Sequence, residues 1–227
     1  PGLLKGPGVA VASCKVGPDY IDPQFHGRAT GRPCFNLDSW AMRPATLAHL
    51  VQQAMRDAEL LIVEGVMGLF DGAPNDAELA PGSTAEIAAR TKLPVVLVLR
   101  ARGIGATAAA LLQGLKQHHR DVQVAGVIFN EVGGERHRAM LVQAAARADL
   151  PVLGCLPAFD DIALPSRHLG LVQAREHDSF DRYLDRLCAH FVPHLELDAL
   201  RALAGAPAIA QTDALRAIAP IGQRIAV

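Results

Sequence analysis

The sequence has 227 residues, of which 50% are hydrophobic and 20% charged, and its formal net charge is −1 at pH 7. A chain of this length can bury one substantial core, and its near-neutral charge argues against nucleic acid as the main partner, because phosphate binding usually leaves a basic footprint. No apolar run is long enough to span a bilayer and no signal segment is evident, so we expect a cytoplasmic protein without a membrane partner.

The first predicted strand covers residues 9–13, and the segment that follows it, residues 15–42, is dense in polar groups. It reads KVGPDYIDPQFHGRATGRPCFNLDSWAM. Asp19 and Asp22 each have a proline beside them, which stiffens the backbone. Both aspartates also follow closely after the end of this predicted strand, which is where open α/β sheets bind their ligands. The alternative is a long, irregular surface loop with solvated acids.

Another acidic position follows the predicted strand at residues 60–63. Glu64 begins the segment EGVMGLFDG, whose glycines let the backbone turn closely around a ligand. A carboxylate at a strand end suits Mg²⁺, which prefers one or two hard carboxylates together with phosphate oxygens and water. Alternatively, Glu64 caps a neighbouring helix, because acidic residues favour helix N-termini.

The segment GSTAEIAAR opens a predicted helix, with Ser83 or Thr84 as its N-cap and Glu86 in the first turn. Capping is a sufficient explanation for the two hydroxyls. A helix start is also an anion site, so the same hydroxyls can contact an anionic substrate.

Apolar runs alternate with helical stretches along most of the chain. Runs that are apolar on both faces predict a parallel sheet covered by helices. We therefore expect an α/β fold with a doubly wound, mostly parallel sheet, helices on both faces, and one domain over residues 1–203. Besides residues 9–13, the predicted strands are 60–63, 95–99, 124–129 and 152–156, and the predicted helices are 44–57, 83–91, 106–118, 135–148 and 197–203.

The cysteines lack the C-x-x-C spacing typical of metal and redox sites. In a protein of this size we expect reduced thiols rather than disulfides. No activating His and Asp partner is evident for Cys14 or Cys34, so neither is predicted to be a nucleophile. The four cysteines are Cys14, Cys34, Cys155 and Cys188.

The string KVGPDYIDPxFHxxATGRPCxNLDxWAM resembles the signature of the cobyrinate (hydrogenobyrinate) a,c-diamide synthase family. These are glutamine-dependent, ATP-consuming enzymes that amidate two acetate side chains of a corrin ring. Related cobyric acid synthases and dethiobiotin synthetases also have a lysine after this strand but do not continue with GPDYIDP. The resemblance extends from Val9 to about Glu176 and implies a P-loop NTPase fold of the dethiobiotin synthetase type.

The resemblance implies ATP and Mg²⁺ as cofactors, a corrin polycarboxylate as substrate, and ammonia that a glutaminase domain releases from glutamine. The family begins with a strand and a phosphate-binding loop, but this sequence contains no G-x-x-x-x-G-K-S/T. We expect residues 204–227 to form a linker and the first strand of a glutaminase domain that is otherwise absent here. Association into a homodimer is a further possibility.

The resemblance also assigns roles to residues. Lys15 neutralises the γ-phosphate or the substrate carboxylate, Asp22 and Glu64 hold Mg²⁺, and Asp19 orients the metal's water or accepts a proton from incoming ammonium. The predicted substrate contacts are His26, Thr30, Ser83 and Thr84. The predicted nucleotide-base contacts are Asn130, which otherwise closes a turn, and Leu156 and Pro157, which otherwise belong to the core.

Two positions depart from the family pattern: Arg100 stands where an aspartate is usual, and Gly134 replaces the more usual serine. Several basic side chains are predicted at the same edge of the sheet, where they form either a rim for an acidic macrocycle or a scatter of solvated charges. They are Arg28, Arg32, Arg43, Arg136, His137, Arg167 and His168.

Two alternatives to corrin amidation stay open. The first is amidation of another tetrapyrrole, such as nickel sirohydrochlorin, which the sequence cannot distinguish from a corrin. The second is a partition-type ATPase switch, because the same architecture serves proteins that bind partners without ligation. Those ATPases lack GPDYIDP, which argues against the second alternative.

Overall fold

A computed structural model describes residues 9–159, 166–167, 170–171 and 180–209. Along these residues, strands alternate with helices. The N-terminal eight residues, His168, most of the predicted linker and the predicted last strand lie outside the described residues. The elements are β1 (Val11–Val16), α2 (Asp22–Thr30), β2 (Phe35–Leu37), α3 (Pro44–Met55), β3 (Leu60–Glu64), α4 (Thr84–Thr91), β4 (Val95–Arg100), α5 (Ala108–Gln117), β5 (Val124–Val132), α6 (Glu135–Arg147), β6 (Val152–Pro157), β7 (Ser166–Arg167), β8 (Gly170–Leu171), α7 (Phe180–Phe191), the 3-10 helix η3 (Val192–His194) and α8 (Leu197–Ala202).

The larger strands form two parallel sheets of three strands each, in the orders β2-β1-β3 and β4-β5-β6. The predicted α/β class with parallel strands is confirmed. The single continuous sheet that we expected is instead divided, because within the described residues β3 pairs only with β1, and β4 only with β5. Among the described strands, β3 and β4 are thus edge strands of their sheets, and Val98 on β4 is 67% exposed.

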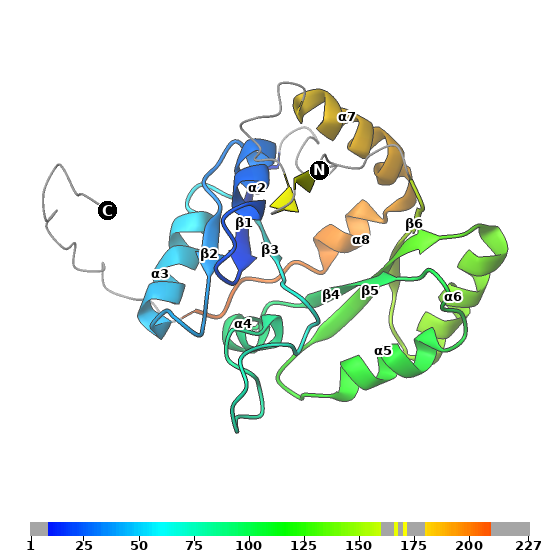
Figure 1. The fold of residues 1–227 in the computed structure, drawn as a ribbon, viewed down its shortest axis with the longest axis horizontal. Helices are drawn as coiled ribbons and strands as arrows, with labels where there is room; N and C mark the ends of the chain where they lie inside the picture. Colours follow the sequence, from blue (N-terminus) through cyan, green and yellow to red (C-terminus); the bar gives the residue numbers. More distant parts are fainter. Residues whose placement is uncertain (1–8, 160–165, 168–169, 172–179, 210–227) are drawn as a thin grey trace, which may run out of the picture.

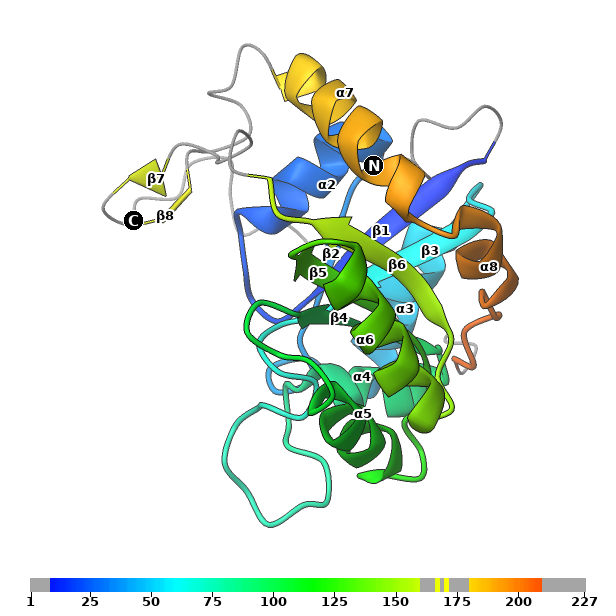
Figure 2. The ribbon, with the colours of Figure 1, turned by 90° about the vertical axis from the view of Figure 1, so that its right-hand side faces the viewer.

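Helices cover the sheets, as Figures 1 and 2 show. On the second sheet, α5 and α6 lie on one side and α7 and α8 on the other (Figure 1). On the first sheet, α3 packs against β1 and β2, and α2 packs against β1. Each sheet has its own apolar core, one centred on Val16, Leu37 and Val51 and the other on Val127 and Phe129.

Residues 15–42 are more regular than predicted. Lys15 is not in a loop after the strand but inside β1, which is buried along its whole length. The same segment contains α2 and β2, neither of which we predicted. Helix α2 has a proline in its first turn and ends at Gly31 with φ 70°, where Gly31 N–H donates to the carbonyl of Gly27 at 2.9 Å.

The four cysteines are free, as expected. Among the described helices, none combines the length and the apolar composition needed to cross a bilayer.

Candidate functional site

The ladder between β1 and β3 brings a lysine beside an acid. Lys15 pairs with Glu64 in register, and the Lys15 Nζ lies 3.2 Å from Glu64 Oε1. The same ammonium lies 3.0 Å from Asp22 Oδ2 and donates to the carbonyl of Gly65 at 2.9 Å. Lys15 is only 4% exposed, so its charge is held almost entirely by protein oxygens. A buried cation of this kind needs such partners to be tolerated.

Helix α2 closes the other side of this group. Asp22 and His26 are one helical turn apart, so their side chains share one face of α2. His26 Nε2 contacts Glu64 Oε2 in a short hydrogen bond. Each oxygen of the Glu64 carboxylate therefore has its own partner, Lys15 on one and His26 on the other.

The charges at this site shift the pKa of the two ladder neighbours in opposite directions. Burial alone would lower the pKa of Lys15, but the hydrogen bonds and charges of Asp22 and Glu64 outweigh it and raise that pKa. Burial alone would raise the pKa of Glu64, but the hydrogen bond from His26 and the charge of Lys15 lower it below its ordinary value. Both shifts favour the charged pair.

The pKa values of Asp19, in the loop, and Asp22, at the start of α2, are also shifted in opposite directions. Burial raises the pKa of Asp22, and a hydrogen bond with Asp19 and the charge of Glu64 keep it raised against the opposing effect of Lys15. Burial also acts on Asp19, but hydrogen bonds from the Ile21 N–H, at 2.7 Å, and from Asp22 lower its pKa. Asp19 therefore stays ionised to lower pH than Asp22.

Asn36 holds this loop in place, a role that we did not predict. Its Nδ2 donates to the carbonyls of Gly17 at 2.7 Å and Asp19 at 2.6 Å. Gly17 has φ 86° and its N–H donates to Leu37, so the turn is fixed from β2. Asn36 belongs to the NLD part of the signature string, and this was the only sequence feature that could have indicated its role in holding the loop.

The start of α4 binds the loop after β3. Ser83 is fully buried, and its hydroxyl accepts a hydrogen bond from the Glu86 N–H at 3.1 Å, which makes it the N-cap. Thr84 Oγ1 accepts from the Val66 N–H at 2.9 Å. The structure thus gives both hydroxyls a structural partner, and their contact with a substrate stays a prediction.

Thr30 is not part of the Lys15 group. It lies eight residues after Asp22 on α2, or about 12 Å along the helix axis at the usual rise per residue. Its hydroxyl donates to the His26 carbonyl at 2.9 Å near the end of the helix.

The three residues predicted to bind the nucleotide base lie on the second sheet. Asn130 is on β5, and its Oδ1 accepts from the Glu131 N–H at 3.0 Å. The register sets Phe129 opposite Cys155 and Val132 opposite Pro157, so Asn130 lies alongside the end of β6 that carries Leu156 and Pro157. The unusual Arg100 forms an ion pair with Glu131, with Nε 2.8 Å from Oε1.

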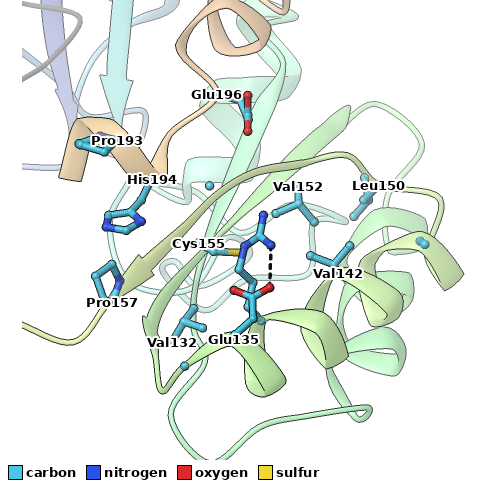
Figure 3. Close-up of a pocket in the computed structure, with 14 residues that line it drawn as sticks. Val132, Glu135, Val142, Leu150, Val152, Cys155, Pro157, Pro193, His194 and Glu196 are labelled. Atoms are coloured by element: carbon cyan, nitrogen blue, oxygen red, sulfur yellow. Dashed lines mark hydrogen bonds and ion pairs between the residues drawn. The ribbon is translucent and has the colours of Figure 1, made fainter. Parts of the chain in front are cut away.

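A cavity of about 670 Å³ lies beside β6, between α6 and the η3–α8 segment (Figure 3). Pro157 lines it together with Cys155 and Arg138, but neither Asn130 nor Leu156 does. Arg138 pairs with Glu135 at 3.2 Å, as the dashed line shows. Lys15, Asp22, His26 and Glu64 do not line this cavity. The candidate site is therefore identified by the arrangement of these charged side chains and not by the size of a cavity.

The Lys15 group has the donors for a divalent cation. Asp22 Oδ2 and Glu64 Oε1 lie 3.0 and 3.2 Å from Lys15 Nζ, so the two carboxylates converge on a position that the ammonium fills in this structure. In the described part of the chain, no group of three or more His, Cys, Asp or Glu side chains is placed to hold a metal. Two carboxylates fit Mg²⁺, which completes its shell with phosphate oxygens and water.

Comparisons with known proteins show which family the chain resembles. The profile of the AAA domain family matches residues 38–166. The chain is 46% identical over 220 residues to a hydrogenobyrinate a,c-diamide synthase of Agrobacterium fabrum, covering 97% of this chain and 50% of that protein. It is 44% identical over 228 residues to one of a Sinorhizobium species, covering 99% of this chain and 51% of the relative. The chain therefore spans about half the length of the curated relatives it matches.

Proposed function

Because the chain belongs to the AAA domain family and resembles one half of the hydrogenobyrinate a,c-diamide synthases over nearly its whole length, we propose that it is the synthetase part of such an enzyme. The proposed reaction is amidation of the a and c acetate carboxylates of cobyrinate or hydrogenobyrinate, in the cytoplasm, during cobalamin biosynthesis. ATP and glutamine-derived ammonia are the co-substrates. The observation that carries the proposal is the Lys15 ammonium held between Asp22 and Glu64 at the carboxyl edge of parallel strands.

The chemistry explains why a cation and acids are needed together. A carboxylate does not react with ammonia at neutral pH, because its carbon is a poor electrophile and its leaving group would be oxide. When bound, ATP supplies a phosphoryl group that turns the substrate carboxylate into an acyl phosphate. Ammonia then attacks the carbonyl carbon, and phosphate leaves. The protein contributes placement and charge stabilisation.

Lys15 is the residue that brings two anions together. Its pKa is raised, so it stays protonated through the neutral range and can neutralise a phosphate oxygen or the substrate carboxylate. Asp22 and Glu64 would hold Mg²⁺, which supplies further positive charge at the phosphates. His26, which binds the second oxygen of Glu64, orients that carboxylate.

Asp19 is the proposed proton acceptor. Its carboxylate is ionised at neutral pH, and its backbone carbonyl is fixed by Asn36 at 2.6 Å. Removing a proton from ammonium produces the nucleophilic amine at the place where it is used.

Isotope transfer and product analysis test the proposal. The natural full-length protein is incubated with ATP, glutamine and hydrogenobyrinate whose carboxylates carry heavy oxygen, and both products are analysed by mass spectrometry. We expect a diamide, with one heavy oxygen appearing in inorganic phosphate for each amide formed. ATP hydrolysis with no amide product would favour a nucleotide switch, and amidation of nickel sirohydrochlorin alone would move the substrate to another ring.

Variants of the acids test the residue roles. Asp19→Asn, Asp22→Asn and Glu64→Gln keep size and remove charge. Each is expected to slow amidation strongly, and the roles assigned above are withdrawn if all three variants keep ATP-dependent amidation intact.

A further inference from the structure

Large hydrophobic side chains are exposed on the three loops that follow the strands of the first sheet. Tyr20 follows β1, Trp40 follows β2 and Met67 follows β3, and their exposed fractions are 66%, 71% and 75%. Because the three strands are adjacent and parallel, these loops lie at one edge of the sheet, the edge where Lys15 is held. An exposed apolar group at a polar site is a sign of a binding surface.

Trp40 is held outward by well-bonded backbone. The Oδ1 of the buried Asp38 accepts from the Trp40 N–H at 3.0 Å and from the Ala41 N–H at 3.3 Å. The Ser39 hydroxyl, next in the chain, contacts the Glu86 carboxylate and accepts from the Gly82 N–H at 3.0 Å. The loop is thus tied to the start of α4, and the exposure of Trp40 does not come from a loose segment.

Met67 is tied to the same helix start. Its neighbour Val66 donates its N–H to Thr84 Oγ1 at 2.9 Å. Met67 itself has φ 50°, a left-handed conformation that non-glycine residues rarely adopt. A strained residue with an exposed apolar side chain, three positions after Glu64, is more typical of a functional loop than of a neutral surface.

We infer that Trp40 and Met67 form an apolar platform that contacts the flat face of the tetrapyrrole ring while its carboxylate reaches Lys15. This inference rests on the proposed function and adds the specificity-determining residues. Apolar contact and charge are needed together, because a ring of this class has hydrophobic faces and a rim of acids. Arg43, exposed three residues after Trp40, makes no ion pair with another described residue and suits a second carboxylate of that rim.

The test separates ring binding from nucleotide binding in the natural full-length protein. Trp40→Ala, Met67→Ala and Trp40→Phe are compared with the wild type for the Kd of hydrogenobyrinate, measured by absorbance titration, and the Kd of a non-hydrolysable ATP analogue. We expect each alanine variant to weaken ring binding by about tenfold or more, as loss of a buried aromatic or apolar anchor does. Trp40→Phe should restore most of the affinity, and nucleotide binding should not change.

A matched control is available on α6. Met140 is also exposed, at 44%, but lies on the second sheet's side of the molecule, so Met140→Ala should leave both Kd values unchanged. Ring affinity equal to the wild type in Trp40→Ala and Met67→Ala would overturn the inference while leaving the proposed amidation intact. A wild-type protein that neither binds nor amidates any ring would overturn both.

Discussion

Lys15 and Glu64 are opposite each other in the β1–β3 ladder, and their side chains form an ion pair of 3.2 Å at the end of both strands. The two residues are far apart in the sequence, so only the parallel pairing of the strands makes them neighbours. This pairing also places the charges where α2 can cover them, through Asp22 and His26. The electrostatics of the site therefore depend directly on sheet register.

Replacing the central cation should abolish most activity. Lys15→Met keeps the length and apolar stem of the side chain but removes the charge, leaving Asp22 and Glu64 without their shared partner. We expect kcat for amidation to fall by at least about 100-fold, the usual cost of losing one preorganised stabilising group. Steady-state release of inorganic phosphate and amide measures the effect. The control is Lys92→Met, which removes an exposed pair with Asp121 and should leave kcat unchanged.

The pKa of Glu64 predicts how stability responds to acid. Its folded-state pKa is lowered from the ordinary value of 4.5, so its contribution to stability is full above that value and is lost as the pH falls through the folded-state pKa. In Glu64→Gln this loss cannot occur. We therefore expect the free energy of unfolding to decline less steeply in the variant between about pH 5 and about pH 3 than in the wild type. Urea unfolding at a series of pH values measures it, and parallel curves would contradict the prediction.

Much of this architecture was accessible from the sequence, for physical reasons. The apolar runs predicted the strands β3, β4, β5 and β6, of which β5 and β6 are largely buried and β3 and β4 only partly, and their flanking helices have clear periodicity. Polar residues at strand ends identified the edge where Lys15, Asp22 and Glu64 meet, because parallel strands present their carboxyl ends together.

Other features had no local signal. Helix α2 has no fully buried residue, so its sequence lacks the apolar stripe by which a helix is recognised. The extension of β1 through Lys15 depends on tertiary partners for the ammonium, which the chain around it does not reveal. Asn36 acts on a loop 17 residues away, a contact that only the β1–β2 pairing creates.

Asn36 should act as a positioning residue. Asn36→Asp replaces the amide donor with a carboxylate that cannot donate to the carbonyls of Gly17 and Asp19. We expect the unfolding free energy to fall by about 1 to 3 kcal/mol. The two backbone carbonyls lose their hydrogen-bond donor, and the new carboxylate oxygens face the carbonyl oxygens. We also expect kcat to fall more than nucleotide affinity. Asn75→Asp, at an exposed turn where the side chain only accepts a hydrogen bond, is the matched control. Equal kcat in Asn36→Asp and the wild type would remove the positioning role.

The close contact between Gly65 and Thr84 gives a prediction about non-additivity. A Cβ at Gly65 would lie 2.8 Å from Thr84 Oγ1 and 2.9 Å from its Cγ2, closer than real side chains approach. Gly65→Ala should therefore destabilise the fold by about 1 to 3 kcal/mol, the usual cost of overpacking. Thr84→Ala alone should cost about 1 kcal/mol, since Val66 N–H loses its acceptor.

In the double variant the clashing atoms are gone, so the extra cost of the Gly65 methyl should largely disappear. The unfolding free energy of Gly65→Ala/Thr84→Ala is then higher than the sum of the single changes predicts, with a coupling of about 1 kcal/mol or more. Chemical denaturation of the four proteins in the cycle measures this coupling. Strict additivity would mean that the turn after Glu64 moves away from α4 when a methyl group is added, and that Thr84 does not set the position of this turn.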